Sequence, residues 1–290
     1  MSSQPSVLVT VDGDVCDPDQ PLLRADDLAA VRGDGIFETL LVRDGRACLV
    51  AAHLHRMARS AEMMELPAPD PAAWQRAIAV AVARWNSLTA DEGALRLVYS
   101  RGRESGSPPT GYLMISALAA RVAAARRDGV CAVLLDRGLP VAGVAEMPWL
   151  LAGAKTLSYA VNMAALRHAA ARGADDVIFV SSDGYILEGP RSTVVIATDT
   201  SRLLTPPLSH PILRGTTVQA LFEVARADGY DCDYQALRPA DLDAAQGIWL
   251  VSSITLGARV HTLDGRRRDC DPRLAELMTG LVDAAIVSDR

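Results

Sequence analysis

A single lysine is the residue of this chain whose type most strongly suggests chemistry. Lys155 is the only lysine among the 29 lysine and arginine residues. Arginine stays protonated at any accessible pH, whereas a lysine amine that is buried or lies beside another cation can lose its proton and act as a nucleophile or a base. The lone lysine therefore suggests a catalytic amine. The alternative is a composition bias that spared one surface lysine.

The residues around Lys155 favour the catalytic interpretation. Residues 152–154 are Ala, Gly and Ala, a slim approach where a bulky group could come close to the backbone. The run 156–171 predicts a helix that Gly173 ends, so that Lys155 would lie at the helix entrance. On that helix Tyr159, four residues later, would share a face with the lysine.

Two further segments could complete a cofactor site. Glu188 follows the apolar run 185–187 and is expected to be buried. Gly215, Thr216 and Thr217 begin a predicted helix, and such a helix start offers backbone N–H groups, hydroxyls and the positive end of the helix dipole to a phosphate. An ordinary helix cap is the alternative for this second segment.

A lysine, a carboxylate and a phosphate cradle are together what pyridoxal phosphate (PLP) requires. The lysine forms a Schiff base with the cofactor's aldehyde. The carboxylate keeps the pyridine nitrogen protonated so that the ring can accept electrons, and N–H groups with an arginine hold the phosphate. The residue types therefore predict a PLP enzyme acting on a small-molecule substrate.

The elements that must position these residues follow from the hydrophobic periodicity. Apolar β-rich runs predict strands over 7–11, 36–42, 96–99, 112–117, 130–135, 176–180 and 194–197. Helical spacing predicts helices that begin at His53, at Ala72 and after Thr217. A charged, alanine-rich segment at 120–129 reads as a connector. We expect a smaller N-terminal α/β domain over residues 1–119 and a larger C-terminal domain, the PLP-binding one, over 130–290.

Composition excludes several classes of protein. A net charge of −6 argues against a nucleic-acid partner. We expect a cytoplasmic protein with no membrane partner, because the N-terminus lacks a signal-peptide pattern and no apolar run reaches the length of a bilayer. The five cysteines are scattered without a CxxC pair, which favours reduced thiols. His53 and His55 lack a third ligand nearby, so no metal site is expected.

The chain resembles the class IV aminotransferase family, also called fold type IV, which includes branched-chain aminotransferases, D-amino acid aminotransferases and 4-amino-4-deoxychorismate lyases. The resemblance covers nearly the whole chain through the motifs GDGIFETLLVRDG, HLHRM, RLVYSRG, AGAKTLSYAVN, LEGPRSTVVI, PPLSHPILRGTT and LVSSITLGARV. It implies a two-domain α/β (α+β) fold like that of D-amino acid aminotransferase, with PLP as cofactor and a homodimer as the assembly.

The resemblance also implies roles for individual residues. Lys155 would be the Schiff-base lysine and the acid/base group, and Glu188 would pair with the pyridine nitrogen. The other implied cofactor contacts are Arg56 and Ser253 to the phosphate, Tyr159 to the ring oxygen, and Thr216 and Thr217 to the phosphate cup. Ser252 is the alternative to Ser253, because the spacing of LVSSI is one residue longer than usual.

The substrate side is expected to involve arginines, because a guanidinium meets a carboxylate with two hydrogen bonds. The candidates are Arg96, Arg101 and Arg259, with exposed surface arginines as the alternative for the last two. Phe37 stands where D-amino acid aminotransferases tend to have a tyrosine that binds the substrate carboxylate. We therefore expect Phe37 to line the substrate site without that hydroxyl.

The segments that differ between the family's activities favour a lyase. The segment 100–102, the strand after Glu188 and the SSI segment are most similar to those of aminodeoxychorismate lyases. The sequence thus predicts conversion of 4-amino-4-deoxychorismate to 4-aminobenzoate and pyruvate, in folate biosynthesis. The alternative is a D-amino acid or branched-chain aminotransferase, or an enzyme with both activities.

Overall fold

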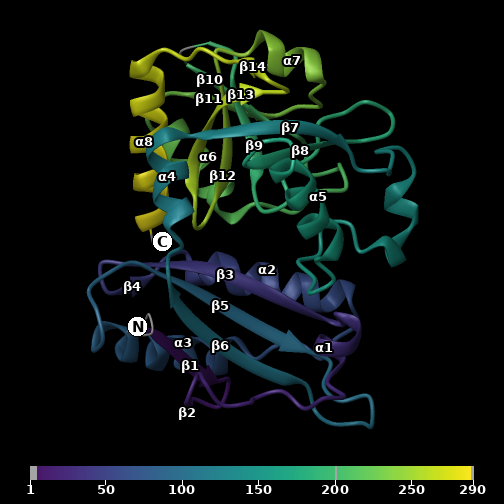
Figure 1. Ribbon diagram of the computed structural model, residues 1–290, viewed down its shortest axis with the longest axis vertical. Coiled ribbons are helices and arrows are strands. Elements are labelled where there is room, and N and C mark those ends of the chain that lie inside the picture. The colour runs from purple at the N-terminus through teal and green to yellow at the C-terminus, as the bar shows by residue number, and fades with distance from the viewer. Residues whose placement is uncertain (1–4, 200, 289–290) are drawn as a thin grey trace. The chain divides into compact units, whose positions relative to one another are not determined.

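The computed structural model describes residues 5–199 and 201–288, and the chain divides into two units (Figure 1). The first unit holds the chain up to Ala119 together with Ala154–Tyr159, and the second holds Ala120–Gly153 and Ala160–Ser288. The lysine segment therefore groups with the first unit, whereas the sequence assigned it to the C-terminal domain. The outer ends of the predicted domains, residues 1 and 290, lie outside the described residues.

The first unit is an antiparallel sheet with two long helices packed against one face. The strand order is β2-β1-β6-β5-β3-β4. Its elements are β1 (Ser6–Thr10), β2 (Val15–Cys16), α1 (Leu28–Arg32), β3 (Gly35–Arg43), β4 (Arg46–Ala47), α2 (Val50–Met63), α3 (Pro71–Asn86), β5 (Gly93–Ser100) and β6 (Thr110–Ala117).

Local sequence explains the main features of this unit. Asp44 and Gly45, both with positive φ, make the tight turn between β3 and β4, a turn that an Asp-Gly pair favours. Asp70 caps α3 by accepting a hydrogen bond from the Ala72 amide, with proline at the first helical position. Alternate strand residues such as Leu95 and Leu97 are fully buried and form the core with α2 and α3.

The second unit is a mixed sheet in the order β11-β10-β9-β12-β13-β7-β8, with β14 paired to β13. Helix α6 packs on β12, α8 packs on β13, and the two helices contact each other. Its strands are β7 (Val130–Asp136), β8 (Asp176–Val180), β9 (Thr193–Ala197), β10 (Arg202–Thr205), β11 (Asp231–Tyr234), β12 (Gly247–Ser252), β13 (Leu256–Leu263) and β14 (Arg266–Arg267). Its helices are α4 (Ala120–Asp128), η1 (Val144–Glu146), η2 (Pro148–Leu150), α5 (Ala160–Ala170), α6 (Thr216–Ala227), α7 (Pro239–Ala244) and α8 (Pro272–Val287).

The segment predicted as a connector is helical. Residues 120–128 form α4, which packs on β13 through the buried Val122. The alanine-rich composition favours a helix, and the apolar Val122 gives that helix one side to bury. None of the helices among the described residues is long and apolar enough to cross a membrane.

Candidate active site

The lysine segment is held along the open edge of β3. The Phe37 amide donates to the Lys155 carbonyl at 3.0 Å, and the Leu157 amide donates to the Gly35 carbonyl at 2.8 Å. The Lys155 amide donates to Ser60 Oγ at 3.1 Å. Because these backbone groups bond to the sheet and to α2, they are not used in a helix.

The prediction of a helix over 156–171 was therefore wrong at its beginning, since α5 starts only at Ala160. Lys155 lies in extended chain five residues before it, and the expected shared helical face of Lys155 and Tyr159 does not exist. A bridge between Ile36 and Thr156 replaces the missing first turn. Pairing with β3 fixes the lysine backbone more tightly than the frayed end of a helix would.

An aromatic pair lies beside the lysine amine. Nζ of Lys155 is 4.5 Å from the centre of the Phe37 ring, a cation–π distance. The Tyr159 ring meets the Phe37 ring edge to face, with centroids 5.4 Å apart and planes at 89°. Phe37 thus connects the two residues that the sequence placed near the cofactor.

A buried ionic cluster lies between β3 and α2. Glu38 is fully buried, and its two carboxylate oxygens accept hydrogen bonds from Nε and one terminal nitrogen of Arg56, at 2.7 and 2.6 Å. Nδ1 of His53 lies 2.7 Å from the same carboxylate. His53 and Arg56 stand three residues apart on α2, so both side chains reach one acceptor on β3.

The charges of this cluster are set by its surroundings. Burial by itself would raise the pKa of Glu38, but the Arg56 cation and His53 together bring that pKa well below its ordinary range. Burial lowers the pKa of His53, and the positive charges of Arg56 and Lys155 lower it further, against the opposing effect of Glu38. At neutral pH the cluster therefore holds an ionised Glu38, a neutral His53 and a cationic Arg56.

The two arginines predicted from the first unit lie in different environments. Arg96 is exposed on β5, opposite Thr39, so it shares the sheet face of Phe37 and points away from the core. Arg101 donates to Asp34 at 2.6 Å and to the carbonyls of Met64 and Glu65. A role for Arg101 in binding substrate stays a prediction, and the structure shows a protein carboxylate as its present partner.

Glu188 lies in the second unit, in the loop that follows β8. It is half-buried, and its Oε2 accepts a hydrogen bond from the Leu213 amide at 3.1 Å. Close packing favours glycine at the next position, because a Cβ at Gly189 would lie 3.0 Å from the Val177 carbonyl oxygen and 2.4 Å from Ser192 Oγ. The carboxylate is thus fixed by the segment that leads into α6.

The start of α6 has the features of an anion cradle. Thr216 and Thr217 are buried, and Thr217 Oγ1 lies 3.4 Å from Ser253 Oγ. The N-cap is Gly215, which has no side chain to cap the helix, and a Cβ there would lie 2.4 Å from Thr193 Oγ1. A glycine N-cap, the close hydroxyl groups of Thr217 and Ser253 and a helix N-terminus therefore lie together, and their role in holding a phosphate group stays a prediction.

The contacts of Ser252, Ser253 and Arg259 show how these predicted residues of the second unit differ. Ser252 bonds Thr255 Oγ1 at 2.6 Å and accepts the Thr255 amide, so it closes a turn, whereas Ser253 points to Thr217. Arg259 lies on β13 between the buried Ala258 and Val260, so its side chain points to the sheet face opposite to theirs. The structure supports Ser253 over Ser252 as the residue near the cradle.

Comparison with known proteins accounts for this set of groups. The model of the family "Amino-transferase class IV" matches residues 35–263. This chain belongs to the class IV aminotransferase family.

The similarity to other members of the class IV aminotransferase family covers nearly the whole chain. It is 69% identical, over 98% of this chain and 100% of the relative, to a bifunctional aminodeoxychorismate lyase / D-amino acid transaminase of Mycobacterium tuberculosis. The PLP-bound structure of a hypothetical aminotransferase from Mycobacterium tuberculosis is 70% identical, with a TM-score of 0.96 and coverage of 99% and 100% of the two chains. A fold IV transaminase from Curtobacterium pusillum is 38% identical, with a TM-score of 0.91 and coverage of 96% and 98%. The predicted family and the fold type IV architecture are confirmed.

Sequence reasoning missed three contacts of this class IV chain. It did not assign the buried Glu38, its partner His53 or the Ser60 hydroxyl that accepts a hydrogen bond from the Lys155 amide. One signal was present, because Glu38 is the only charge within the apolar run 36–42, where an acid requires a buried partner. Ser60 had no comparable signal, since a serine in an amphipathic helix is ordinary.

Proposed function

We propose that this chain is a PLP-dependent lyase that converts 4-amino-4-deoxychorismate to 4-aminobenzoate and pyruvate, and that it also transaminates D-amino acids. The observation that carries the proposal is end-to-end similarity, at 69% identity, to a protein named for both reactions. The second activity is favoured by the same name. A chemically suitable set of side chains at the matching motifs supports both.

The residues present fit the cofactor. Lys155 is the amine that would bind its aldehyde, and Glu188 the carboxylate for its ring nitrogen. The phosphate would be held by the start of α6, where Gly215 places no side chain, and by the Thr216, Thr217 and Ser253 groups. Arg56 would add a cation to the phosphate, and Tyr159 a hydroxyl to the ring oxygen. When bound, PLP supplies a ring that accepts electrons from the carbon bearing the substrate's amino group.

The main catalytic work of this chain falls to Lys155. Its amine would remove the proton from the carbon that bears the substrate's amino group and return a proton at a later step. The backbone bonds to β3 and Ser60 hold the start of this side chain, so only its four-carbon stem has to move. The centre of the Phe37 ring lies 4.5 Å from Nζ, so the ring covers one side of the amine.

Arginines would bind the substrate carboxylates. Arg96 is the strongest candidate, because it shares a sheet face with Phe37, which touches the lysine. Arg101 and Arg259 remain candidates; Arg101 would have to exchange its bond to Asp34 for a substrate carboxylate. The lyase and the transaminase share these groups, and the presence of a leaving group on the substrate decides which reaction follows proton removal.

The test is a two-product assay of the PLP-loaded enzyme. With 4-amino-4-deoxychorismate we expect 4-aminobenzoate and pyruvate in equal amounts, and with D-alanine and 2-oxoglutarate we expect pyruvate and glutamate. Lys155→Ala should lose both reactions and the visible absorbance of the bound cofactor. Lys155→Arg is the matched control that keeps a cation but no nucleophilic amine, and it should be equally inactive. Turnover in either variant would contradict the assignment of the lysine.

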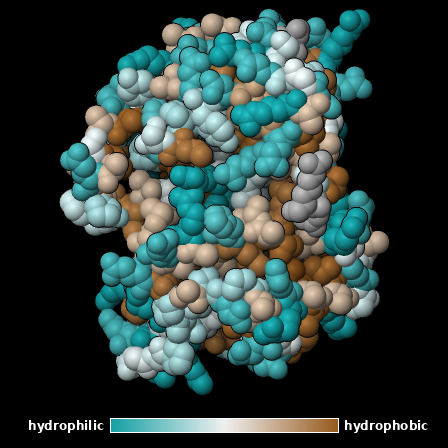
Figure 2. Space-filling model, turned by 180° about the vertical axis from the view of Figure 1, so that it is seen from behind, coloured by the Kyte–Doolittle hydropathy of each residue, from teal (hydrophilic) through white to brown (hydrophobic). Residues whose placement is uncertain are grey.

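We also propose that the protein is a cytoplasmic homodimer. Cytoplasmic residence is supported by the five cysteines, all of which are free thiols. Apolar residues reach the surface among hydrophilic ones on the face in Figure 2. Within the described part of the chain, the most exposed large apolar side chain is Trp149, at 72%, and Met147, Val161 and Met163 of the same unit are also exposed. If these residues form the dimer contact, sedimentation should give a dimer for the wild type and more monomer for Trp149→Glu. A wild-type monomer at micromolar concentration would refute the dimer.

A further inference from the structure

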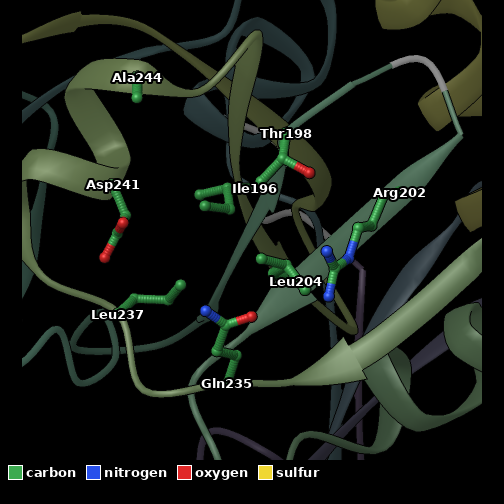
Figure 3. Close-up of a pocket in the computed structure, with 8 residues that line it drawn as sticks. All are labelled: Ile196, Thr198, Arg202, Leu204, Gln235, Leu237, Asp241 and Ala244. Atoms are coloured by element: carbon green, nitrogen blue, oxygen red, sulfur yellow. The ribbon is translucent and has the colours of Figure 1, made fainter.

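A small pocket in the second unit lies outside all the residues assigned above. It has a volume of about 260 Å³ and is built on β9, β10, the segment after β11 and α7. Figure 3 shows Arg202 and Asp241 on opposite sides of it. Three apolar side chains lie between them, those of Ile196, Leu204 and Leu237.

The floor of the pocket is a rigid part of the core. Ile196 and Leu204 are cross-strand partners on β9 and β10, and both are buried, as is Leu237. Side chains two residues apart on a strand share a face, so Arg202 extends over the same surface as Leu204. The pocket therefore combines an apolar base that cannot rearrange cheaply with a cation at one end.

The guanidinium of Arg202 lies near two carboxylates of its own unit, those of Asp231 and Asp199. Nε of Arg202 lies 3.0 Å from Asp231 Oδ2, across the parallel pair β10 and β11. Within residues 5–199 and 201–288, however, no acceptor is aligned for a hydrogen bond from that Nε–H. The contact with Asp231 is thus an ion pair without a directed bond, between side chains that are 41% and 65% exposed. Such a pair contributes little and can be exchanged for a ligand carboxylate.

The opposite end carries hydrogen-bond acceptors. Oδ2 of Asp241 accepts a bond from the Arg238 amide at 2.7 Å, which fixes the direction of the carboxylate. Gln235 adds an amide that both donates and accepts. A donor such as an amine would be recognised here.

We propose that this pocket binds a small amino-carboxylate whose amine and carboxylate are separated by an apolar body. The carboxylate meets Arg202, the body lies over Leu204, and the amine donates to Asp241. The volume is below the range of about 300–1,000 Å³ typical of drug-sized ligands, which fits a molecule with one ring. An α-amino acid carries both groups on one carbon with no apolar body between them, so it serves as the contrasting ligand. The choice of 4-aminobenzoate as the representative ligand rests on the proposed lyase function; the pocket itself does not.

The test is calorimetric titration of the full-length, PLP-loaded protein with 4-aminobenzoate, benzoate and D-alanine. We expect 4-aminobenzoate to bind a site that Arg202→Gln weakens at least tenfold. Asp231→Asn breaks the same ion pair but keeps the guanidinium, so it should bind at least as well as the wild type. Arg172→Gln, an exposed arginine of the same unit outside the pocket, is the matched control and should bind unchanged. Benzoate should bind more weakly than 4-aminobenzoate, and Asp241→Asn should reduce that difference.

Three results would overturn the proposal. Binding of 4-aminobenzoate that is indifferent to Arg202→Gln would locate it elsewhere, and an equal loss in Asp231→Asn would make the arginine merely structural. Binding of D-alanine that depends on Arg202 would assign the pocket to a different class of ligand. The lyase assay runs beside the titration: Arg202→Gln should keep wild-type turnover, and Arg202-dependent binding by a protein without lyase activity would sustain this pocket while refuting the proposed function.

Discussion

Removing the charge of Glu38 is expected to destabilise the first unit severely. In Glu38→Gln the side chain keeps its shape, but the fully buried carboxylate that faces Arg56 and His53 is replaced by a neutral amide. Three hydrogen bonds end on the two oxygens of Glu38 in the wild type. A glutamine offers one oxygen, so its NH₂ group must face at least one of the three donors.

The magnitude follows from the burial of the partner. Arg56 is only 9% exposed, so its charge would remain inside the unit without the carboxylate that pairs with it. Breaking a buried ion pair from one side costs about 3–5 kcal/mol. The free energy of unfolding should fall by that amount at neutral pH. The difference should shrink in acid, because the wild-type carboxylate has a lowered pKa and its stabilisation is lost as the pH falls below the ordinary glutamate value towards the folded-state value.

Urea unfolding followed by tryptophan fluorescence measures this loss, since Trp74 and Trp85 are buried in the same core. Glu62→Gln, an exposed glutamate on α2, is the matched control and should stay within about 0.5 kcal/mol of the wild type. A Glu38→Gln protein that unfolds at the wild-type urea concentration would show that the cluster is not a coupled, buried charge pair. The reasoning about the charge states of its members would then fail.

Three further predictions concern single positions. Gly215→Ala should weaken PLP binding about tenfold in a cofactor titration, because its Cβ would lie 2.4 Å from Thr193 Oγ1. Its control, Gly280→Ala on α8, meets nothing within 4 Å and should stabilise the fold by about 0.5–1 kcal/mol. Unchanged PLP affinity in Gly215→Ala would count against the cradle. Because the pKa of His53 is lowered in the folded protein, the free energy of unfolding should fall as the pH drops below the ordinary histidine value of 6.5. In His53→Gln this dependence of the unfolding free energy on pH should be weaker. An equal dependence in the two proteins would show that other groups cause it. Asp27→Ala should lower the free energy of unfolding by about 2–3 kcal/mol, because this buried carboxylate accepts three hydrogen bonds. It should also speed trypsin cleavage in the loop after β5. An unaltered cleavage rate would mean that other contacts hold the loop.

The family and its cofactor could be predicted from the sequence because the groups that indicate them are carried by local features. A unique lysine, a glycine followed by two threonines at a helix start, and an acid after an apolar run each indicate their chemistry without knowledge of the fold. The helix after Thr217 buries Val218, Leu221, Phe222 and Ala225 as its spacing predicted. Local periodicity determines such an element, because the same residues that define the pattern become its buried face.

The partners of these residues were decided by tertiary structure. The sequence around Lys155 favours a helix, yet hydrogen bonds to β3, more than a hundred residues earlier in the chain, hold it extended. Helix propensity differs by less than about 1 kcal/mol per residue among ordinary residues, so a few backbone bonds to a preformed strand edge outweigh it. The partners of Glu38 and Arg101 are likewise invisible in a one-dimensional pattern, because an ion pair depends on which elements pack together. The sequence by itself thus determined the family, the cofactor chemistry and most elements, while the pairing of strands and charges across distant segments decided the setting of each group.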